Sequence, residues 1–391
     1  GPISFEIPAT LNLLGRNFTI LDSERLIVGV IFSMGAFWIF GSRIAGANSF
    51  FVSIIMAITT LFIAALSVDP FLYAALIIEI AVLVSIPIFF QRLQPVKHGV
   101  IRFLVFQTLA VPFILFSGWA FNVAPSSVNS QMAYIQAGIL LFIGIGLWLA
   151  IFPFYTWVPL LAKDGHPYSA GFIFSMFLST ILLFLMDFFN NFNWLREEAI
   201  LLTVSQTLGI VMIVLGGLFA AFQKEVSRLL GYAVMVEIGF SLLALSLFQE
   251  IGWRSYVLLL VPRLFGIAIC ALSISVWNNL VINMEMSSFS GQVYKTPFAL
   301  VGFFTGWFTF AGLPLFPGFP TKLPILNGLS QFSINPIIFV AIGLFGLFVS
   351  GFRFISIVFT KPEKESVPIS EPLIQKIYFI FGIILLILMG I

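Results

Sequence analysis

Apolar residues fill the chain in long runs, which are separated by short stretches rich in charged residues, proline and glycine. A helix that crosses the hydrocarbon core of a bilayer needs about 20 predominantly apolar residues. Runs of this kind fall near residues 25–42, 48–67, 70–91, 98–122, 131–155, 167–190, 198–222, 226–247, 255–279, 296–320, 334–357 and 372–390. The pattern therefore predicts an all-α polytopic membrane protein with about twelve transmembrane helices.

The connections between these runs are short, so none of them can hold a soluble domain. Residues 1–24 carry several charges and lack a positive segment followed by an apolar core, so we expect an extramembrane N-terminal segment and not a targeting signal. Residues 25–391 are predicted to form a single transmembrane domain.

Composition supports this class of protein. Of the 391 residues, 60% are apolar and only 9% are charged, whereas a soluble domain carries about 25% charged residues. The net charge of +2 gives no basis for nucleic-acid binding, and the single cysteine, Cys270, excludes disulfide frameworks, haem attachment and cysteine-ligated clusters. The chain also lacks Walker A, GxGxxG and HExxH motifs. We therefore expect no cofactor, metal or catalytic redox centre in this chain.

Lysine and arginine residues are distributed unevenly between the two sides of the predicted bundle. Twelve crossings place both termini on one side, whose loops hold few basic residues: Arg16, Arg25, Arg196 and Arg254. The loops of the opposite side hold Arg43, Arg92, Lys97, Lys163, Lys224, Arg228, Lys295, Lys361, Lys364 and Lys376. Basic loops face the cytoplasm, so we expect the termini on the non-cytoplasmic side of a membrane, most simply a bacterial plasma membrane.

Four ionisable residues fall inside the apolar runs: Glu79, Glu237, Arg263 and Lys322. An ionisable group in hydrocarbon costs several kcal/mol unless it faces a cavity or a partner. These residues are therefore the candidates for a function inside the membrane.

Prolines interrupt the helical pattern at two places. The run AGLPLFPGFPTKLPIL holds four prolines, which we expect to preclude a regular helix around Lys322, and IFPFYTWVP is interrupted around Pro153 and Pro159. A broken helix at membrane depth is tolerated only where it lines a cavity or is buried in protein.

The two breaks occupy corresponding positions, two helices after Glu79 and two helices after Glu237. This arrangement predicts two inverted-topology repeats with two broken helices, at about 48–190 and about 198–357, followed by a terminal helix at 372–390. Burial lowers the pKa of a lysine and a nearby carboxylate raises it. A Glu/Lys pair in a hydrated cavity can therefore take up and release a proton near neutral pH.

Three segments carry a resemblance to a known family: LLFIGIGLWLAIFPFYTWVPLLAKDGHPYSA, KEVSRLLGYAVMVEIGFSLLAL and LVGFFTGWFTFAGLPLFPGFPTKLPIL. They resemble, in this order, signatures of the antiporter-like membrane subunits of respiratory complex I and of its relatives, the membrane-bound hydrogenases and multisubunit cation/proton antiporters. The match begins at the family's third helix, so the chain lacks counterparts of the first two helices. The resemblance implies that both termini are non-cytoplasmic, in agreement with the distribution of basic residues.

The resemblance also implies roles for single residues. Glu79 corresponds to the family's fifth-helix glutamate, and Lys322 corresponds to its twelfth-helix lysine or glutamate. Trp148 stands in place of the seventh-helix lysine, and GFIFSMFLSTILL lacks the eighth-helix lysine. The eleventh-helix His and Lys are also missing, although Arg263 falls near them. Glu237 stands where the family usually has His or Gln, so the second half resembles a Glu/Lys unit and the first half has an acid without its basic partner.

The predicted proton relay therefore consists of Glu79, Glu237 and Lys322. Arg263 is a candidate counter-ion, since a guanidinium cannot release its proton near neutral pH, and Glu237 then has the alternative role of neutralising Arg263. Lys163 and His166 fall in a predicted exposed connection and are candidates for a proton entrance.

Together these features predict a proton-translocating, antiporter-like membrane subunit of a complex I-type pump, which would be a NAD(P)H- or ferredoxin:quinone oxidoreductase. Its expected partners are other membrane subunits, the lipid bilayer and protons or sodium ions, with no nucleic acid; redox chemistry would belong to other subunits. Two alternatives stay open at this point: a degenerate homologue that serves as a structural or docking subunit without transport, and a free-standing cation/proton antiporter.

Overall fold

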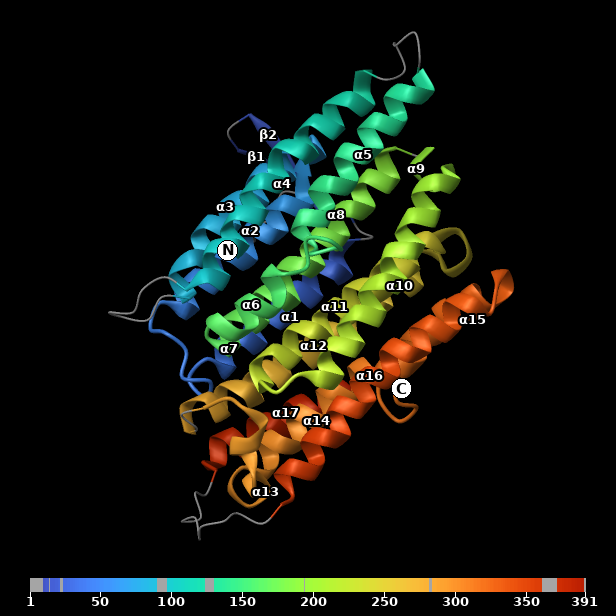
Figure 1. Cartoon of the computed structure of the whole chain (residues 1–391). Coiled ribbons are helices and arrows are strands. Elements are labelled where there is room, and N and C mark those ends of the chain that lie inside the picture. Colours follow the sequence, from blue (N-terminus) through green and yellow to red (C-terminus); the bar gives the residue numbers. More distant parts are fainter. Residues whose placement is uncertain are drawn as a thin grey trace, which may run out of the picture.

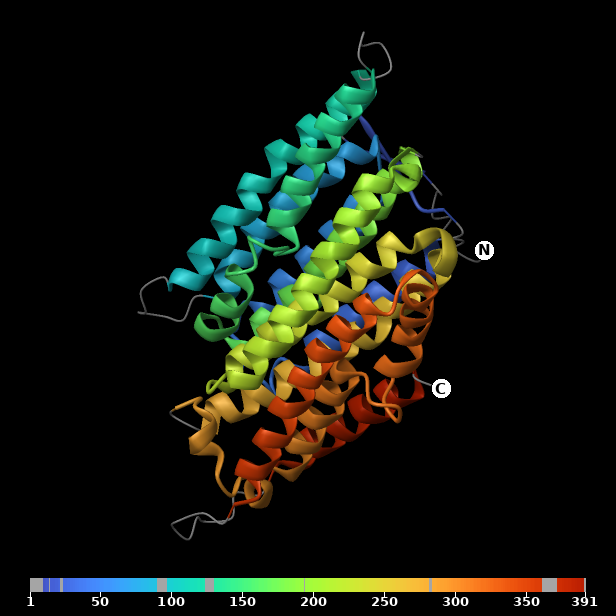
Figure 2. The ribbon, with the colours of Figure 1, turned by 45° about the vertical axis from the view of Figure 1, so that its right-hand side comes forward.

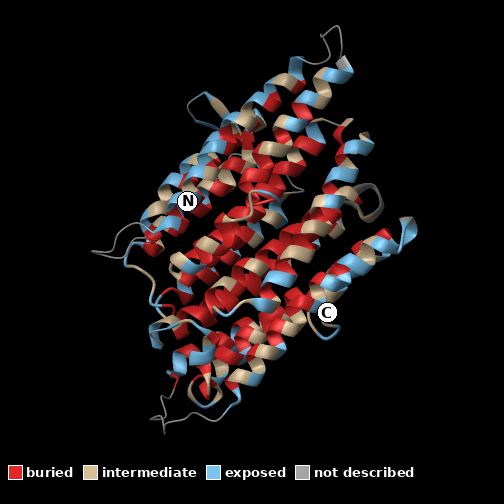
Figure 3. Cartoon of the chain, viewed as in Figure 1, coloured by how far each residue is buried: buried red, intermediate tan, exposed pale blue. Residues whose placement is uncertain are grey.

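The computed structural model describes residues 10–13, 15–21, 24–89, 97–123, 130–192, 194–280, 283–360 and 371–389. Its helices lie side by side in one elongated bundle (Figure 1). In both views α4 and α5 lie on one side and α14, α16 and α17 on the other, with α10, α11 and α12 between them (Figure 2). Buried residues concentrate in this middle layer (Figure 3).

The helices of the N-terminal half are α1 (Arg25–Gly41), α2 (Phe51–Ser67), α3 (Ala74–Ser85), α4 (His98–Val123), α5 (Ser130–Trp148), α6 (Trp157–Asp164), α7 (Pro167–Phe172), α8 (Leu178–Asn191) and α9 (Trp194–Glu197). A π-helical turn, Ile173–Phe177, joins α7 to α8. The helices of the C-terminal half are α10 (Ala199–Phe222), α11 (Val226–Ser246), α12 (Phe248–Leu280), α13 (Gln292–Lys295), α14 (Pro297–Ala311), α15 (Gly318–Phe332), α16 (Asn335–Val358) and α17 (Leu373–Leu388).

Each of the twelve predicted runs contains a helix, which confirms the prediction of a polytopic α-helical bundle. Within the described residues, eight helices are long and apolar enough to cross a membrane, and α1, α2, α14 and α17 are shorter apolar helices. The number of twelve crossings stays a prediction, as does the side on which the termini lie. Arg92, Lys361 and Lys364, which entered the count of basic loop residues, lie outside the described residues.

A small antiparallel sheet adds to the helical bundle, and the apolar pattern did not predict it. Strand β1 (Thr10–Leu13) pairs with β2 (Arg16–Thr19), which pairs with β3 (Val68–Asp69). Gly15, with φ +73°, lies in the connection between β1 and β2. The register opposes Phe18 to Val68, so the segment before α1 is tied to the end of α2.

The two broken helices end in the same way. At the end of α5, the Ile151 N–H donates to Gly146 O, and Ala150 has a left-handed φ of 55°. At the end of α14, the Leu313 N–H donates to Phe308 O, and Gly312 has a left-handed φ of 68°. Both ends are Schellman motifs, in the same register of the two halves. This correspondence is consistent with the two predicted repeats, whose boundaries stay a prediction.

The expectation that prolines preclude a regular helix around Lys322 was wrong. The break covers residues 312–317, and α15 starts at Gly318 and continues through Pro324. Pro320 lies in the first turn, where a helix has no intrahelical acceptor for the missing N–H, so it does not interrupt the hydrogen-bond ladder. A Cβ at Gly318 would lie 1.9 Å from Thr309 O. Only glycine lets α15 start directly beside the last turn of α14.

Candidate functional site

Glu237 and Lys322 form a buried ion pair between α11 and α15. The Lys322 Nζ lies 2.6 Å from the Glu237 Oε1, and the two residues are 2% and 3% exposed, respectively. The structure therefore brings together two of the three residues predicted to relay protons, although they are far apart in the sequence. Taking two charges out of water costs several kcal/mol per ion, so the pair is stable only with close geometry and further hydrogen bonds.

The broken helix supplies those further hydrogen bonds. Lys322 Nζ donates to Phe310 O at 2.6 Å and to Thr309 O at 3.4 Å. Both carbonyls belong to the last turn of α14. The break leaves Phe310 O without an intrahelical donor, and Thr309 O accepts only the N–H of the cap residue Gly312, at 3.2 Å. A helix C-terminus also carries partial negative charge. The Phe240 ring centroid lies 4.8 Å from Nζ and adds a cation–π contact. The helix break thus supplies some of the groups that stabilise the buried ammonium of Lys322.

Arg263 is fully buried in α12, but its direct contacts are two hydroxyl groups. Its Nη1 donates to Ser241 Oγ at 2.8 Å, and its Nη2 donates to Ser179 Oγ at 3.2 Å. Ser241 Oγ in turn donates to the backbone carbonyl of Glu237 at 3.1 Å. Lys322, and not Arg263, contacts the Glu237 carboxylate, so a counter-ion role for Arg263 would act over a longer distance. The sequence did not single out either serine, although both are polar residues inside apolar runs.

Glu79 lies apart from this pair. It belongs to α3, which packs against α2 and α4, whereas α11 packs against α6, α10, α12, α14 and α15. Glu79 is half-buried, and its Oε1 accepts a hydrogen bond of 2.6 Å from the Thr108 hydroxyl of α4. Its Oε2 has no hydrogen-bond partner among the described residues. The third predicted relay residue is therefore a carboxylate near the bundle surface, with no basic partner in the described part of the chain.

The first half holds no counterpart of the buried lysine. Trp148 is fully buried, and its Nε1 donates to Gln107 O at 3.1 Å. The register that aligns Ala150 with Gly312 aligns Leu160, a helix α6 residue, with Lys322. The Gln107 side chain is also buried, and neither its Nε2 nor its Oε1 has a hydrogen-bond partner among the described residues. Among the described residues, the place of the missing basic residues is thus taken by the buried Trp148, by Leu160 and by an unpartnered Gln107 amide.

Lys163 and His166 lie at the corner between α6 and α7. Lys163 is exposed and pairs with Glu225 at 3.5 Å; Arg228 lies 3.2 Å from the same carboxylate. Between them, the Asp164 Oδ2 accepts the N–H of Gly99 at 2.8 Å. The predicted exposed connection was wrong for His166, whose two ring nitrogens are buried without a hydrogen-bond partner among the described residues. Burial lowers the pKa of His166 to about 4, so its imidazole is neutral at physiological pH.

Within the part of the chain that the structure describes, no three His, Cys, Asp or Glu side chains lie together in an arrangement that could hold a metal ion.

Comparisons with known proteins agree on one family. The family model described as NADH:quinone oxidoreductase/Mrp antiporter, TM matches residues 104–350. The chain is 26% identical over 267 residues to NAD(P)H-quinone oxidoreductase chain 4-3 of Nostoc sp. strain PCC 7120, covering 64% of this chain and 47% of the relative. It is 26% identical over 254 residues to NADH-quinone oxidoreductase subunit N of a Wolbachia sp. from Brugia malayi, covering 63% and 53%. The chain thus spans about half the length of these relatives.

Solved structures share the fold. A chain of the archaeal membrane-bound sulfane sulfur reductase superposes with a TM-score of 0.85 at 17% identity, covering 97% of this chain and 67% of that one. A chain of the Mrp complex from Dietzia sp. DQ12-45-1b gives 0.78 at 15% identity, covering 96% and 82%. A chain of respiratory complex I from Thermus thermophilus gives 0.70 at 18% identity, covering 93% and 84%.

The buried pair leads to a stability prediction. Lys322→Met leaves Glu237 buried without its partner, so we expect the free energy of unfolding to fall by about 3–5 kcal/mol. Glu237→Gln together with Lys322→Met should cost less than the sum of the two single changes, because no lone charge is left. Denaturant titration in mixed micelles measures these differences. Lys163→Met breaks an exposed pair and is the matched control, with an expected loss of at most about 1 kcal/mol. Additive losses at Glu237 and Lys322 would contradict the pairing.

His166 leads to a prediction about pH. Its pKa is about 4 in the folded chain and about 6.5 in an unfolded chain. Between these values only the unfolded chain binds the proton, so stability falls as the pH drops from about 6.5 to about 4, by at most about 3 kcal/mol. His166→Gln should flatten this part of the curve of unfolding temperature against pH. His98→Gln, at the chain's other histidine, which is exposed, should leave the curve unchanged; equal curves for wild type and His166→Gln would refute the burial effect.

Proposed function

The chain belongs to the NADH:quinone oxidoreductase/Mrp antiporter transmembrane family, and we propose that it is a proton-translocating, antiporter-like membrane subunit of a complex I-type redox-driven ion pump. The observation that carries the proposal is the buried Glu237–Lys322 pair at the broken helix. Its partners are other membrane subunits, which contribute the redox reaction, while this chain contributes the proton step.

The pair has the chemistry that a proton step requires. Within one hydrogen bond of 2.6 Å, a proton can pass from the ammonium of Lys322 to the carboxylate of Glu237, which converts two charges into a neutral amine and a neutral acid. At low dielectric the energies of these two states respond strongly to any nearby change of charge. A charge that appears at a neighbouring subunit therefore shifts the pair between its ionised and neutral forms.

The helix break makes this equilibrium depend on conformation. The carbonyls of Thr309 and Phe310 stabilise the charged lysine more strongly than the neutral amine. A displacement of the end of α14 away from Nζ would lower the proton affinity of Lys322, and water admitted at the break would accept the proton. Alternating access from the two faces thus follows from small movements of a non-helical segment at membrane depth.

Glu79 is proposed as the point of coupling to a neighbouring subunit. A half-buried carboxylate in the middle of a membrane helix, with one oxygen unpartnered, is costly when only lipid and apolar side chains surround it. A protein partner that covers α3 and α4 removes that cost. A basic or protonatable group on this partner would pair with Glu79, which has no basic partner in the described part of this chain. The protonation of Glu79 would then change when the charge of the neighbouring subunit changes.

A second candidate function is that of a structural or docking subunit without transport. The buried Trp148, and Leu160 at the position that corresponds to Lys322, favour this alternative. Neither side chain can take up or release a proton, so the first half has no counterpart of the Glu237–Lys322 pair. Under this alternative the Glu237–Lys322 pair fixes the position of α15 against α11 and carries no protons. The third reading, a free-standing cation/proton antiporter, predicts a chain that functions without partners.

Transport measurements separate the first two functions. With the complex purified from its native membrane and reconstituted in vesicles, we expect Lys322→Met to lower redox-driven proton uptake at least tenfold, because the pair can no longer exchange a proton. Glu79→Gln should lower uptake more moderately. Matched controls are Lys376→Met and Glu285→Gln, which lie outside the pair and should pump normally.

The proposed functions differ in whether Lys322→Met changes pumping or assembly. If Lys322→Met assembles and pumps at the rate of the wild type, the relay is wrong. If it lowers only the amount of assembled complex while pumping per complex is unchanged, the structural role is correct. Mass spectrometry of the gently solubilised complex tests the partners: co-purification with iron–sulfur and quinone-site or hydrogenase subunits supports the pump subunit, and recovery of the chain alone supports the free-standing antiporter.

We also propose that the chain resides in a bacterial plasma membrane with its termini outside the cytoplasm. Cys270 is buried, so a Cys270→Ala background allows single cysteines to be placed in turn. Leu11→Cys should react with a membrane-impermeant maleimide in intact cells, and Lys97→Cys should react only after permeabilisation. The reverse pattern would invert the orientation.

A further inference from the structure

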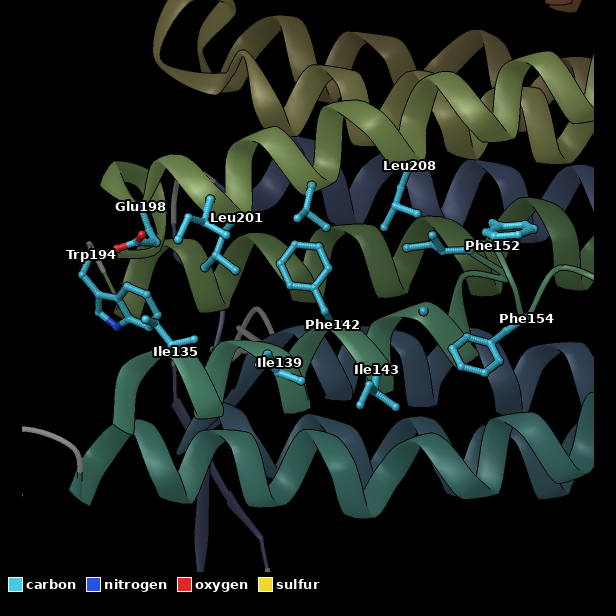
Figure 4. A pocket seen from close by; sticks show the side chains of 14 residues that line it. Ile135, Ile139, Phe142, Ile143, Phe152, Phe154, Trp194, Glu198, Leu201 and Leu208 are labelled. Atoms are coloured by element: carbon cyan, nitrogen blue, oxygen red, sulfur yellow. The ribbon is translucent and has the colours of Figure 1, made fainter. Parts of the chain in front are cut away.

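A cavity lies away from the ion pair, on the side of the bundle. It has a volume of about 270 Å³ and is bounded by α5 and α10, with Ile139 and Ile143 on one side and Leu201 and Leu208 on the other (Figure 4). Ile139 and Ile200 are 53% and 58% exposed, so the cavity is open to the outside of the bundle. Because both helices are long and apolar enough to cross a membrane, the opening faces lipid.

The cavity has the depth of one leaflet. Along α5 its lining runs from Ile135 to Gly146, which corresponds to about 16 Å at 1.5 Å per residue. The hydrocarbon core of a bilayer is about 30 Å thick. Phe152 and Phe154, in the break that follows α5, line the inner end, and the outer end lies beside α9 (Figure 4). The cavity therefore starts at the membrane surface and stops near the middle of the bilayer.

Polar groups occur only at the outer end of the lining. Trp194 and Glu198 lie there, and every other lining residue is apolar or glycine (Figure 4). The Trp194 Nε1 is enclosed by the protein, so the cavity meets the apolar ring of this indole and not its N–H. The Glu198 carboxylate is the charged hydrogen-bond acceptor of the lining. A ligand that matches this lining has a cationic donor at its head and an apolar tail.

We infer that this cavity binds one acyl chain of a glycerophospholipid with an ammonium-bearing headgroup, such as phosphatidylethanolamine, from the leaflet beside α9. The ammonium donates to Glu198, and the acyl chain lies along the apolar lining. A transmembrane helix of a partner would need a groove through both leaflets. A quinone offers only carbonyl acceptors and leaves the carboxylate unsatisfied, and an anionic headgroup is repelled by it.

Lipid retention by the intact chain tests this inference. The purified protein is stripped of lipid in detergent, mixed with equimolar dioleoyl phosphatidylethanolamine and dioleoyl phosphatidylglycerol, and measured by native mass spectrometry. We expect one tightly retained phosphatidylethanolamine, favoured about tenfold over phosphatidylglycerol, as one charge-assisted hydrogen bond provides. Val204→Trp fills the cavity and should abolish retention. Glu198→Gln should keep a bound lipid and bring the ratio of the two headgroups close to one.

The matched control is Ile342→Trp, a lipid-facing residue of α16 that is 41% exposed and lies outside the cavity; it should retain the lipid as the wild type does. Equal unfolding temperatures of the two tryptophan variants exclude misfolding as the cause. The inference is overturned if Val204→Trp retains the lipid, if Glu198→Gln leaves the headgroup ratio unchanged, or if an added quinone displaces the lipid from wild type and Glu198→Gln alike. None of these measurements depends on transport, so they are independent of the proposed pump function.

Discussion

A lysine ammonium buried among apolar helices has to be solvated by the protein itself, and around Lys322 this requirement involves three helices. The Glu237 carboxylate of α11 supplies the opposite charge, and the last turn of α14 supplies two carbonyl oxygens. Those carbonyls are available only because α14 stops at Ala311, and α15 can restart beside them only because Gly318 has no side chain. The solvation of one charge at membrane depth therefore depends on a helix break and on the close approach of α14 and α15.

Much of this arrangement could be predicted from the sequence. Long apolar runs with charged connections define the helices because a membrane-spanning helix must satisfy its own backbone. Glu237 and Lys322 stood out for the same reason, since a charge inside such a run requires a partner. The sequence alone did not specify which charges meet: both Lys322 and Arg263 were available to Glu237. Packing of α11 against α15 decides this in favour of the lysine, and Arg263 instead contacts Ser241 and Ser179, whose short polar side chains leave little trace in an apolar pattern.

Other structural features were not predicted from the sequence, and most of them depend on contacts between distant parts of the chain. The strands β1, β2 and β3 are too short for a periodic pattern, and they form because the N-terminal segment meets the end of α2. The start of α15 over Pro320 was missed because proline is disruptive in a helix interior but tolerated in a first turn; Pro324 lies in the interior of α15, which continues past it. His166 was expected in an exposed connection, yet the corner between α6 and α7 covers both ring nitrogens. For the sheet and for His166, tertiary contact determines the outcome, whereas for Pro320 its position in the first turn of α15 does.

The surroundings of Lys322 also bear on selectivity among cations. A carboxylate oxygen and backbone carbonyl oxygens are the hard ligands that sodium uses, and here they already surround a cation that is covalently attached to the chain. The ammonium competes with inorganic cations for these oxygens. An inorganic ion can bind to them only if Lys322 is neutral and has moved away. Arginine would never vacate the position, and a neutral side chain would leave it open. In the proposed relay, the identity of this one residue would therefore decide whether the oxygens at the break are free to bind a metal ion.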